Sequence, residues 1–196
     1  MINSEKMRIA VFASGNGTNA ENLIRYFKHS NVAEVSLILT NNPAAYVLQR
    51  ALSEGVSTMV INRDFRKSER KMLSLLSEYD IGFIVLAGYL LLIPPWLVAQ
   101  YRGRIVNIHP ALLPRYGGKW MYGEHVHKAV LQSGDKESGI TIHYVNEQYD
   151  QGDIIFQAAC PVLPGDTHES LAARIHALEY EHFPRVIDEV IKTHSS

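Results

Sequence analysis

Two polar side chains stand two residues apart where an apolar run meets a proline. They are Asn107 and His109, within the stretch Gly103 to Pro114. Because successive side chains of a strand point to opposite faces, an extended chain would present both on one face. Open parallel sheets bind ligands beyond the carboxyl ends of their strands, so this pair suits a reaction centre. Equally, the amide and the imidazole could serve only to satisfy the backbone of the turn at Pro110.

A glycine-rich loop is the second candidate site. Ser14-Gly-Asn-Gly-Thr-Asn19 follows the apolar run Arg8 to Ala13 and leads into a predicted helix. This order presents free backbone N–H groups at a helix N-terminus, which stabilises a bound phosphate. A nicotinamide cofactor is disfavoured because the next strand ends in Asn41-Asn42 rather than in an acid, and nucleotide triphosphate hydrolysis because the loop lacks the Walker lysine. A plain tight turn is the alternative.

The elements that would position these residues alternate along the chain. Continuous apolar runs at 8–13 and 82–87 predict strands buried on both faces. Further strands are expected at 35–40, 57–61 and 103–109, and helices at 43–55, 65–79 and 95–103. The pattern ends with a helix from 124, neighbouring strands at 137–145 and 153–159, and a long amphipathic helix from 166 that Pro184 kinks or interrupts.

Two further loops carry unusual residues. Leu90 to Ile93 are four apolar residues in a predicted connection, and they either line a pocket for a flat aromatic ligand or belong to the core. Arg115 to Gly123 is rich in glycine and aromatic residues. His125 and His127 follow it with the spacing of a metal pair, but no acid or thiol cluster accompanies them, so surface or substrate-binding histidines are favoured over a metal site.

Composition limits the class of protein. The chain has 196 residues, 46% of them hydrophobic, which suits one domain spanning residues 1–196. Its 19 basic and 20 acidic residues give a net charge of -1, so we expect a small-molecule partner and no nucleic acid. The single Cys160, and the lack of an apolar leader or a membrane-length run, predict a cytoplasmic protein without membrane association.

Taken together, these residues resemble the phosphoribosylglycinamide formyltransferases of the folate-dependent formyltransferase superfamily. The resemblance covers Met7 to about Val190 and rests on the glycine loop, Leu86-Ala-Gly88, Asn107-Ile-His-Pro-Ala-Leu-Leu-Pro114, Asp150-Gln-Gly-Asp-Ile-Ile155 and Gly165-Asp-Thr167. It implies an α/β fold, with a Rossmann-like, mostly parallel central sheet flanked by helices, a C-terminal hairpin and a long helix. It also implies an enzyme of de novo purine synthesis that uses 10-formyltetrahydrofolate without a metal, as a monomer or homodimer.

The same resemblance implies roles for individual residues. The catalytic set would be Asn107, His109 and Asp150. The phosphate and ribose of glycinamide ribonucleotide, over the N-terminal half, would be held by Gly17, Thr18, Asn19 and Glu179. The folate, in a cleft toward the C-terminal half, would contact Leu90, Leu91, Leu92, Ile93, Asn107, Asn146 and Asp150, with Arg66 near its tail.

Three positions depart from the family pattern. Many relatives carry an arginine that contacts the folate tail, where Ser68 stands here with Arg66 and Lys67 nearby. Many also have an arginine in place of Leu91 and a shorter loop than Gly117 to Glu124. The family pattern therefore does not identify the residues that contact the folate tail in this chain.

Formyl transfer sets clear demands on these side chains. An uncharged amine attacks the formyl carbon, and the carbonyl oxygen becomes negative. The amide N–H of Asn107 and a hydrogen-donating His109 can hold that oxygen, each worth about 3 kcal/mol in comparable acyl-transfer sites. Asp150 can orient or charge the imidazole and help pass a proton through water to the folate nitrogen. A carboxylate beside His109 would raise the pKa of the imidazole toward the working pH.

Other activities remain compatible with the sequence. A sugar-nucleotide formyltransferase or a formyltetrahydrofolate hydrolase would use similar catalytic residues with a different amine or with water. A methionyl-tRNA formyltransferase would need a C-terminal nucleic-acid-binding domain, for which the 196 residues leave no room. From a different class, a phosphate-ligand binding module without catalysis would make Asn107 and His109 simple turn residues.

Overall fold

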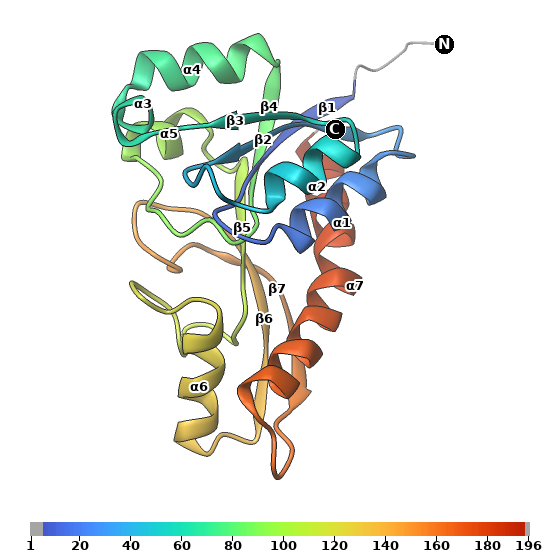
Figure 1. Ribbon diagram of the computed structural model, residues 1–196, viewed down its shortest axis with the longest axis vertical. Coiled ribbons are helices and arrows are strands. Elements are labelled where there is room, and N and C mark those ends of the chain that lie inside the picture. Colours follow the sequence, from blue (N-terminus) through green and yellow to red (C-terminus); the bar gives the residue numbers. More distant parts are fainter. Residues whose placement is uncertain (1–5, 195–196) are drawn as a thin grey trace.

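Seven strands form one sheet in the computed structural model, which describes residues 6–194. Their order across the sheet is β3-β2-β1-β4-β5-β6-β7 (Figure 1). β1 to β5 run parallel, whereas β6 is antiparallel to both β5 and β7. The strands are β1 Met7–Phe12, β2 Ala33–Thr40, β3 Ser57–Val60, β4 Ile81–Leu86, β5 Ile105–His109, β6 Glu137–Tyr144 and β7 Ile154–Pro161.

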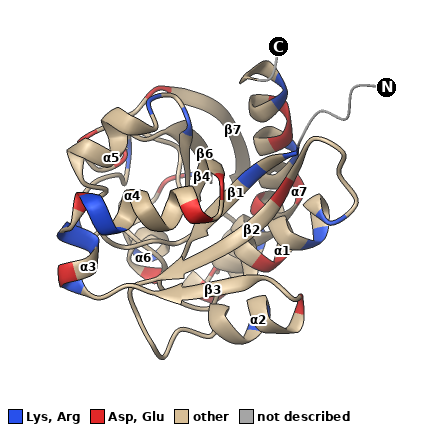
Figure 2. Cartoon of the chain, turned by 90° about the horizontal axis from the view of Figure 1, so that it is seen from above, with Lys and Arg blue, Asp and Glu red and all other residues tan. Residues whose placement is uncertain are grey.

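Helices cover both faces of this sheet (Figures 1 and 2). They are α1 Thr18–Phe27, α2 Val47–Ser53, α3 Arg63–Lys67, α4 Glu69–Glu78, α5 Pro95–Gln100, α6 Glu124–Ser133 and α7 His168–His194. The core of one face includes residues of α1, α2 and α7, and the core of the other includes residues of α4 and α5. The Rossmann-like, mostly parallel sheet with a C-terminal hairpin and long helix is thus confirmed.

The apolar run of β1 shows why the sheet is buried on both sides. Ile9 and Val11 belong to one core, and Ala10 and Phe12 to the other. Because side chains alternate along a strand, only a continuous apolar run can fill two cores at once. β1 accordingly lies inside the sheet, between β2 and β4, and its carboxyl end leads into the glycine loop.

Two helices differ from their predicted form. The helix expected at 65–79 is two helices, α3 and α4, because Ser68 leaves the helical conformation and its hydroxyl accepts from Lys71 N at 3.4 Å. α7 continues through Pro184 instead of being interrupted. The proline cannot donate to the carbonyl of Tyr180, and Asn22 Nδ2 of α1 donates to that oxygen at 3.0 Å instead. The neighbouring helix thus replaces the missing bond.

None of the helices within residues 6–194 is long and apolar enough to cross a membrane. Lysine and arginine are interspersed with aspartate and glutamate in the view of Figure 2.

Candidate active site

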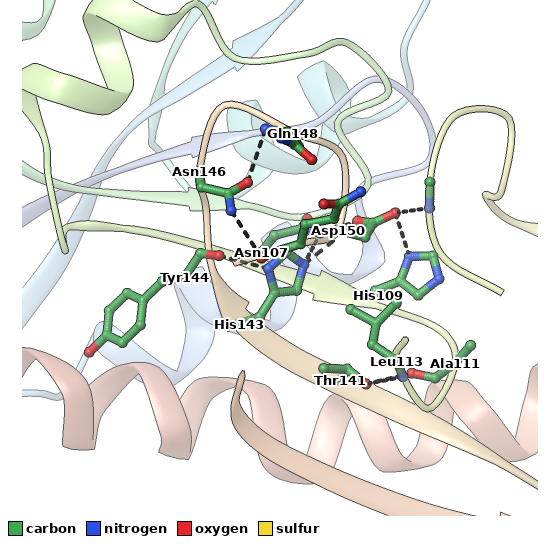
Figure 3. Close-up of polar contacts among 12 residues, drawn as sticks. Asn107, His109, Ala111, Leu113, Thr141, His143, Tyr144, Asn146, Gln148 and Asp150 are labelled. Atoms are coloured by element: carbon green, nitrogen blue, oxygen red, sulfur yellow. Dashed lines mark hydrogen bonds and ion pairs between the residues drawn. The ribbon is translucent and has the colours of Figure 1, made fainter. Parts of the chain in front are cut away.

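The carboxyl half of β5 meets β6 in a register that pairs polar residues. Asn107 lies opposite His143, and His109 lies opposite Thr141. Asn107 Nδ2 is 3.1 Å from His143 Nε2 and 3.4 Å from Asp150 Oδ1. The side chains of Asn107, His143 and Asp150 converge, as Figure 3 shows. The predicted pair Asn107 and His109 is therefore joined by Asp150, and by a histidine that the sequence analysis missed.

His143 fixes the orientation of the Asn107 amide. Its Nδ1 lies 2.8 Å from the carbonyl oxygen of Tyr144, which can only accept, so Nδ1 carries the proton. Asn107 Nδ2 also donates to Asp150 Oδ1, a carboxylate oxygen that only accepts, so the amide turns its NH₂ group toward both partners. Asn107 consequently presents N–H donors at the place where Asp150 and the carboxyl end of β5 meet.

His109 is buried between two acceptors. Its Nε2 lies 2.8 Å from the carbonyl oxygen of Tyr116, and its Nδ1 lies 3.5 Å from Asp150 Oδ2. Burial lowers the pKa of His109, while Asp150 and the bond to Tyr116 act in the opposite direction. We expected Asp150 to raise the pKa of His109 toward the working pH. This expectation is wrong, because the pKa of His109 is lowered overall. The carboxylate has the predicted sign, but the loss of hydration outweighs it.

Asp150 is held as a carboxylate. Gly118 N donates to its Oδ2 at 2.9 Å, and His143 Nε2 lies 3.6 Å from its Oδ1. Burial works to raise the pKa of Asp150, but the contacts with His143, His109 and Gly118 outweigh it and lower the pKa. The residue adopts φ 54° in the turn between β6 and β7. A Cβ on Gly152 would lie 1.7 Å from the carbonyl oxygen of Tyr144, so this turn packs directly on β6.

The glycine loop forms the other end of the site. Gly17 is the N-cap of α1 with φ 77°, a left-handed conformation that favours glycine. A Cβ at this position would lie 2.3 Å from Val47 Cγ2 of α2. The loop therefore needs glycine both for its backbone angle and for its close approach to α2.

Glu179 ties α7 to the first turn of α1. Its Oε2 accepts from Asn19 Nδ2 at 2.9 Å and lies 2.8 Å from His176 Nδ1. The bond to Glu179 raises the pKa of His176. Asn19 and Glu179, which are 160 residues apart in the sequence, are thus in direct contact.

One cavity of about 1100 Å³ joins both ends of the site. The predicted residues that line it are Gly17, Thr18, Asn19, Leu90, Leu91, Asn107, His109, Asp150 and Glu179. Four predicted folate contacts are not among its lining residues. These are Leu92, Ile93, Asn146 and Arg66.

The four outlying residues have other surroundings. Ile93 packs in the core with α4 and α5, so the loop of Leu90 to Ile93 is partly pocket and partly core. Asn146 bonds within its own turn, to Gln148 N and to the carbonyl of Gln151 (Figure 3). Arg66 acts electrostatically on Tyr89, whose pKa burial raises to about 12 and which does line the cavity.

His127, one of the two histidines after the aromatic-rich loop, also lines this cavity. Its side chain is buried, and its Nδ1 has no hydrogen-bond partner within the part of the chain that the structure describes. Burial lowers its pKa to about 4, so the ring is neutral at neutral pH. No group of three or more residues suited to holding a metal ion occurs among residues 6–194.

Known proteins have a similar fold and a related sequence. A family model described as formyl transferase matches residues 7–187. The chain belongs to the formyl transferase family. Its fold is similar to the crystal structure of phosphoribosylglycinamide formyltransferase from Bacillus halodurans, with a TM-score of 0.85 and 37% identity over 94% of this chain and 95% of that one. A second structure, of the protein of that name from Anaplasma phagocytophilum, gives a TM-score of 0.87 at 35% identity, over 96% of this chain and 88% of that one.

Two curated members of the formyl transferase family are longer proteins. The chloroplastic phosphoribosylglycinamide formyltransferase of Arabidopsis thaliana is 40% identical over 94% of this chain. The trifunctional purine biosynthetic protein adenosine-3 of Drosophila melanogaster is 40% identical over 95% of it. This chain spans 65% of the length of the plant protein and 14% of that of the insect protein.

Proposed function

We propose that the chain transfers the formyl group of 10-formyltetrahydrofolate to the amine of 5'-phosphoribosylglycinamide. The products are formylglycinamide ribonucleotide and tetrahydrofolate, in de novo purine (IMP) biosynthesis. The observation that carries the proposal is the single cavity of about 1100 Å³, which has the glycine loop at one end and Asn107, His109 and Asp150 at the other. Membership of the formyl transferase family and the names of the relatives support it.

The ribonucleotide would bind at the glycine loop. Its phosphate would accept from the free backbone N–H groups at the start of α1, at Gly17, Thr18 and Asn19. Glu179, already bonded to Asn19, would accept from the ribose hydroxyls or the glycinamide part. These contacts would point the amine along the cavity toward β5.

The folate would occupy the other end. Its pterin would lie against Leu90 and Leu91, which line the cavity. Contacts from Leu92, Ile93, Asn146 and Arg66, which do not line it, stay predictions of the family resemblance. The formyl carbon would then stand between the amine and Asn107.

The chemistry follows from the donors that face this point. When the amine attacks, the formyl oxygen becomes an oxyanion, and the NH₂ group that His143 orients on Asn107 can donate to it. A protonated His109 is the second donor, stabilised by Asp150. Asp150 also accepts the proton that leaves the nitrogen, directly or through water, and returns it to the departing folate nitrogen.

We further propose that residues 1–196 act as one formyltransferase domain, as a monomer or a homodimer in the cytoplasm. The single sheet and the match over residues 7–187 support the first part. The low net charge of -1 supports a small-molecule substrate without nucleic acid.

One assay tests the transfer. The protein is mixed with 10-formyltetrahydrofolate and glycinamide ribonucleotide, and folate absorbance is followed with and without the amine. Turnover that requires the amine is expected. Equal rates without the amine would instead identify a hydrolase, and no turnover would identify a binding module. Turnover with an amino sugar nucleotide but not with glycinamide ribonucleotide would identify a sugar-nucleotide formyltransferase.

A further inference from the structure

Tyr116 holds His109 through its backbone and not through its side chain. Its carbonyl oxygen is the group that lies 2.8 Å from His109 Nε2. The residue adopts φ 57°, in the left-handed region that bulky residues rarely enter. Because a residue in this region costs free energy, other contacts must hold Tyr116 in place.

The side chain of Tyr116 supplies those contacts on the outer surface. Its hydroxyl donates to Asp135 Oδ2 at 2.6 Å and lies 2.5 Å from Ser133 Oγ. Arg115 NH2 reaches the other oxygen of Asp135 at 2.5 Å. The bonds from Tyr116 and Arg115 lower the pKa of Asp135, so it is a charged acceptor at neutral pH. Ser133 and Asp135 lie at the end of α6 and just before β6.

We propose that Arg115, Tyr116, Ser133 and Asp135 form a positioning clamp that fixes the orientation and tautomer of His109 for the reaction. The clamp touches no substrate and acts only through the carbonyl of Tyr116. Its kinetic consequence rests on the proposed formyl transfer, whereas its effect on His109 itself does not.

The tautomer follows from the acceptor. A carbonyl oxygen can only accept, so Nε2 of His109 carries a proton in either charge state. In the neutral ring the lone pair of Nδ1 then faces the carboxylate of Asp150, 3.5 Å away. In the imidazolium both nitrogens donate to acceptors. The clamp therefore occupies Nε2 and favours the protonated ring, and the Nδ1–H, which faces Asp150 at 3.5 Å, is the ring donor that can turn to an oxyanion.

Several charged or titratable groups face His109 from the elements around it. Asp150 lies in the turn after β6, His143 on β6, Glu179 on α7 and His127 on α6. Burial and His143 lower the pKa of His109, and Asp150, the Tyr116 carbonyl and Glu179 raise it. If the clamp is loosened, one of the contributions that raise the pKa weakens. The pKa of His109 must then fall.

The surroundings of the clamp leave space for such a movement. A second cavity of about 460 Å³ is bordered by Arg115, Tyr116, Asp135 and Ser138. The Tyr116 side chain borders this cavity and also packs against the apolar core, so the bond to Asp135 helps to choose between these surroundings. Loosening the hydroxyl contact can thus move the backbone of residue 116.

The test is a titration of His109 by NMR in the full-length protein, with its ring signal assigned by its loss in His109→Asn. Tyr116→Phe and Asp135→Asn should each shift the midpoint of His109 to lower pH, by on the order of half a unit to one unit. Asp135→Glu, which keeps a charged acceptor, should shift it less. Tyr26→Phe is the matched control, since it removes a tyrosine contact with Asp188 between α1 and α7.

Kinetics provide the second readout. In Tyr116→Phe we expect kcat to fall by about tenfold, with both KM values changed less than twofold, and the fall to grow with pH as the imidazolium is lost earlier. An unchanged His109 midpoint in a folded Tyr116→Phe or Asp135→Asn protein overturns the clamp, even if formyl transfer is found. A shifted midpoint in a protein without transfer activity keeps the clamp and refutes the proposed function.

Discussion

The two ends of the cavity are built by different means. At the end of β1 the proposed binding groups are backbone N–H groups, and the requirement on the sequence is a residue with no Cβ at Gly17. At the end of β5 the groups are side chains, which come from β5, from β6 and from the turn that holds Asp150. The first end therefore requires a particular backbone conformation, and the second requires particular side chains.

Because the two ends are built differently, substitutions at each end should impair different properties of the protein. Loss of a side chain at the β5 end should remove chemistry and leave binding of the ribonucleotide, because its phosphate would be held by backbone N–H groups at the other end of the cavity. A Cβ at Gly17 should weaken binding and stability, because it moves the helix start that would hold the phosphate.

The largest effect is expected at the β5 end. His109→Ala should lower turnover by about 10²- to 10⁴-fold, since it removes both an oxyanion donor and a proton-handling group. Affinity for glycinamide ribonucleotide, measured by calorimetry, should change little. His29→Ala, on the exposed surface, is the control. Near-normal turnover of His109→Ala would remove this residue from the mechanism.

The opposite failure is expected at the glycine loop. In Gly17→Ala the new Cβ would lie 2.3 Å from Val47 Cγ2, at a φ of +77°. We expect a loss of about 1–3 kcal/mol in the free energy of unfolding and a weaker binding of the ribonucleotide. Urea unfolding and calorimetry measure the two quantities.

Gly15→Ala is the matched control for this variant, because a Cβ there meets no atom within 4 Å. It should cost clearly less stability. Val47→Ala in the Gly17→Ala background should restore part of the loss by removing the clash. Equal stability of the two alanine variants would show that the close approach of Gly17 to α2 is unimportant.

An effect confined to acidic pH is expected for His127, which also lines the cavity. Its folded pKa of about 4 is below the unfolded value near 6.5, so the unfolded chain takes up the proton first on acidification. The stability that this neutral ring contributes is fully present above about pH 6.5 and is lost as the pH falls toward 4. Its share is on the order of 1–3 kcal/mol.

His127→Gln should therefore lose less stability than the wild type between pH 7 and pH 4. Unfolding curves in urea at several pH values measure this difference. The exposed His29→Gln serves as the control. Parallel pH profiles for wild type and His127→Gln would show that the buried ring takes up its proton as easily as an unfolded one.

The two ends also differed in how far the sequence predicted them. The glycine loop is local: a strand, two glycines and a helix follow one another, and the structure places Gly17 at the start of α1 as expected. The pair Asn107 and His109 was predicted from the alternation of a strand. In both cases residues close together in the sequence were enough to predict the local structure.

What the sequence analysis missed depends on distant contacts. His143 could have been suspected, because it and Thr141 alternate with the buried Ile140 and Ile142. Its role, however, follows from a register that pairs it with Asn107. The hydrogen bond between the Tyr116 carbonyl and His109 forms with Tyr116 at a positive φ. A bulky residue adopts such a φ only where tertiary contacts enforce it. Burial, which reverses the net pKa shift of His109, is likewise a property of the whole fold.

Asp150→Asn tests the division between the two ends most directly. The variant removes the charge beside His109 and leaves the glycine loop untouched. The measurement is a single-turnover rate together with the dissociation constant for glycinamide ribonucleotide. We predict a rate at least about 100-fold lower and a dissociation constant within about twofold of the wild type. A near-normal rate, or a loss that appears only in the dissociation constant, would contradict the account.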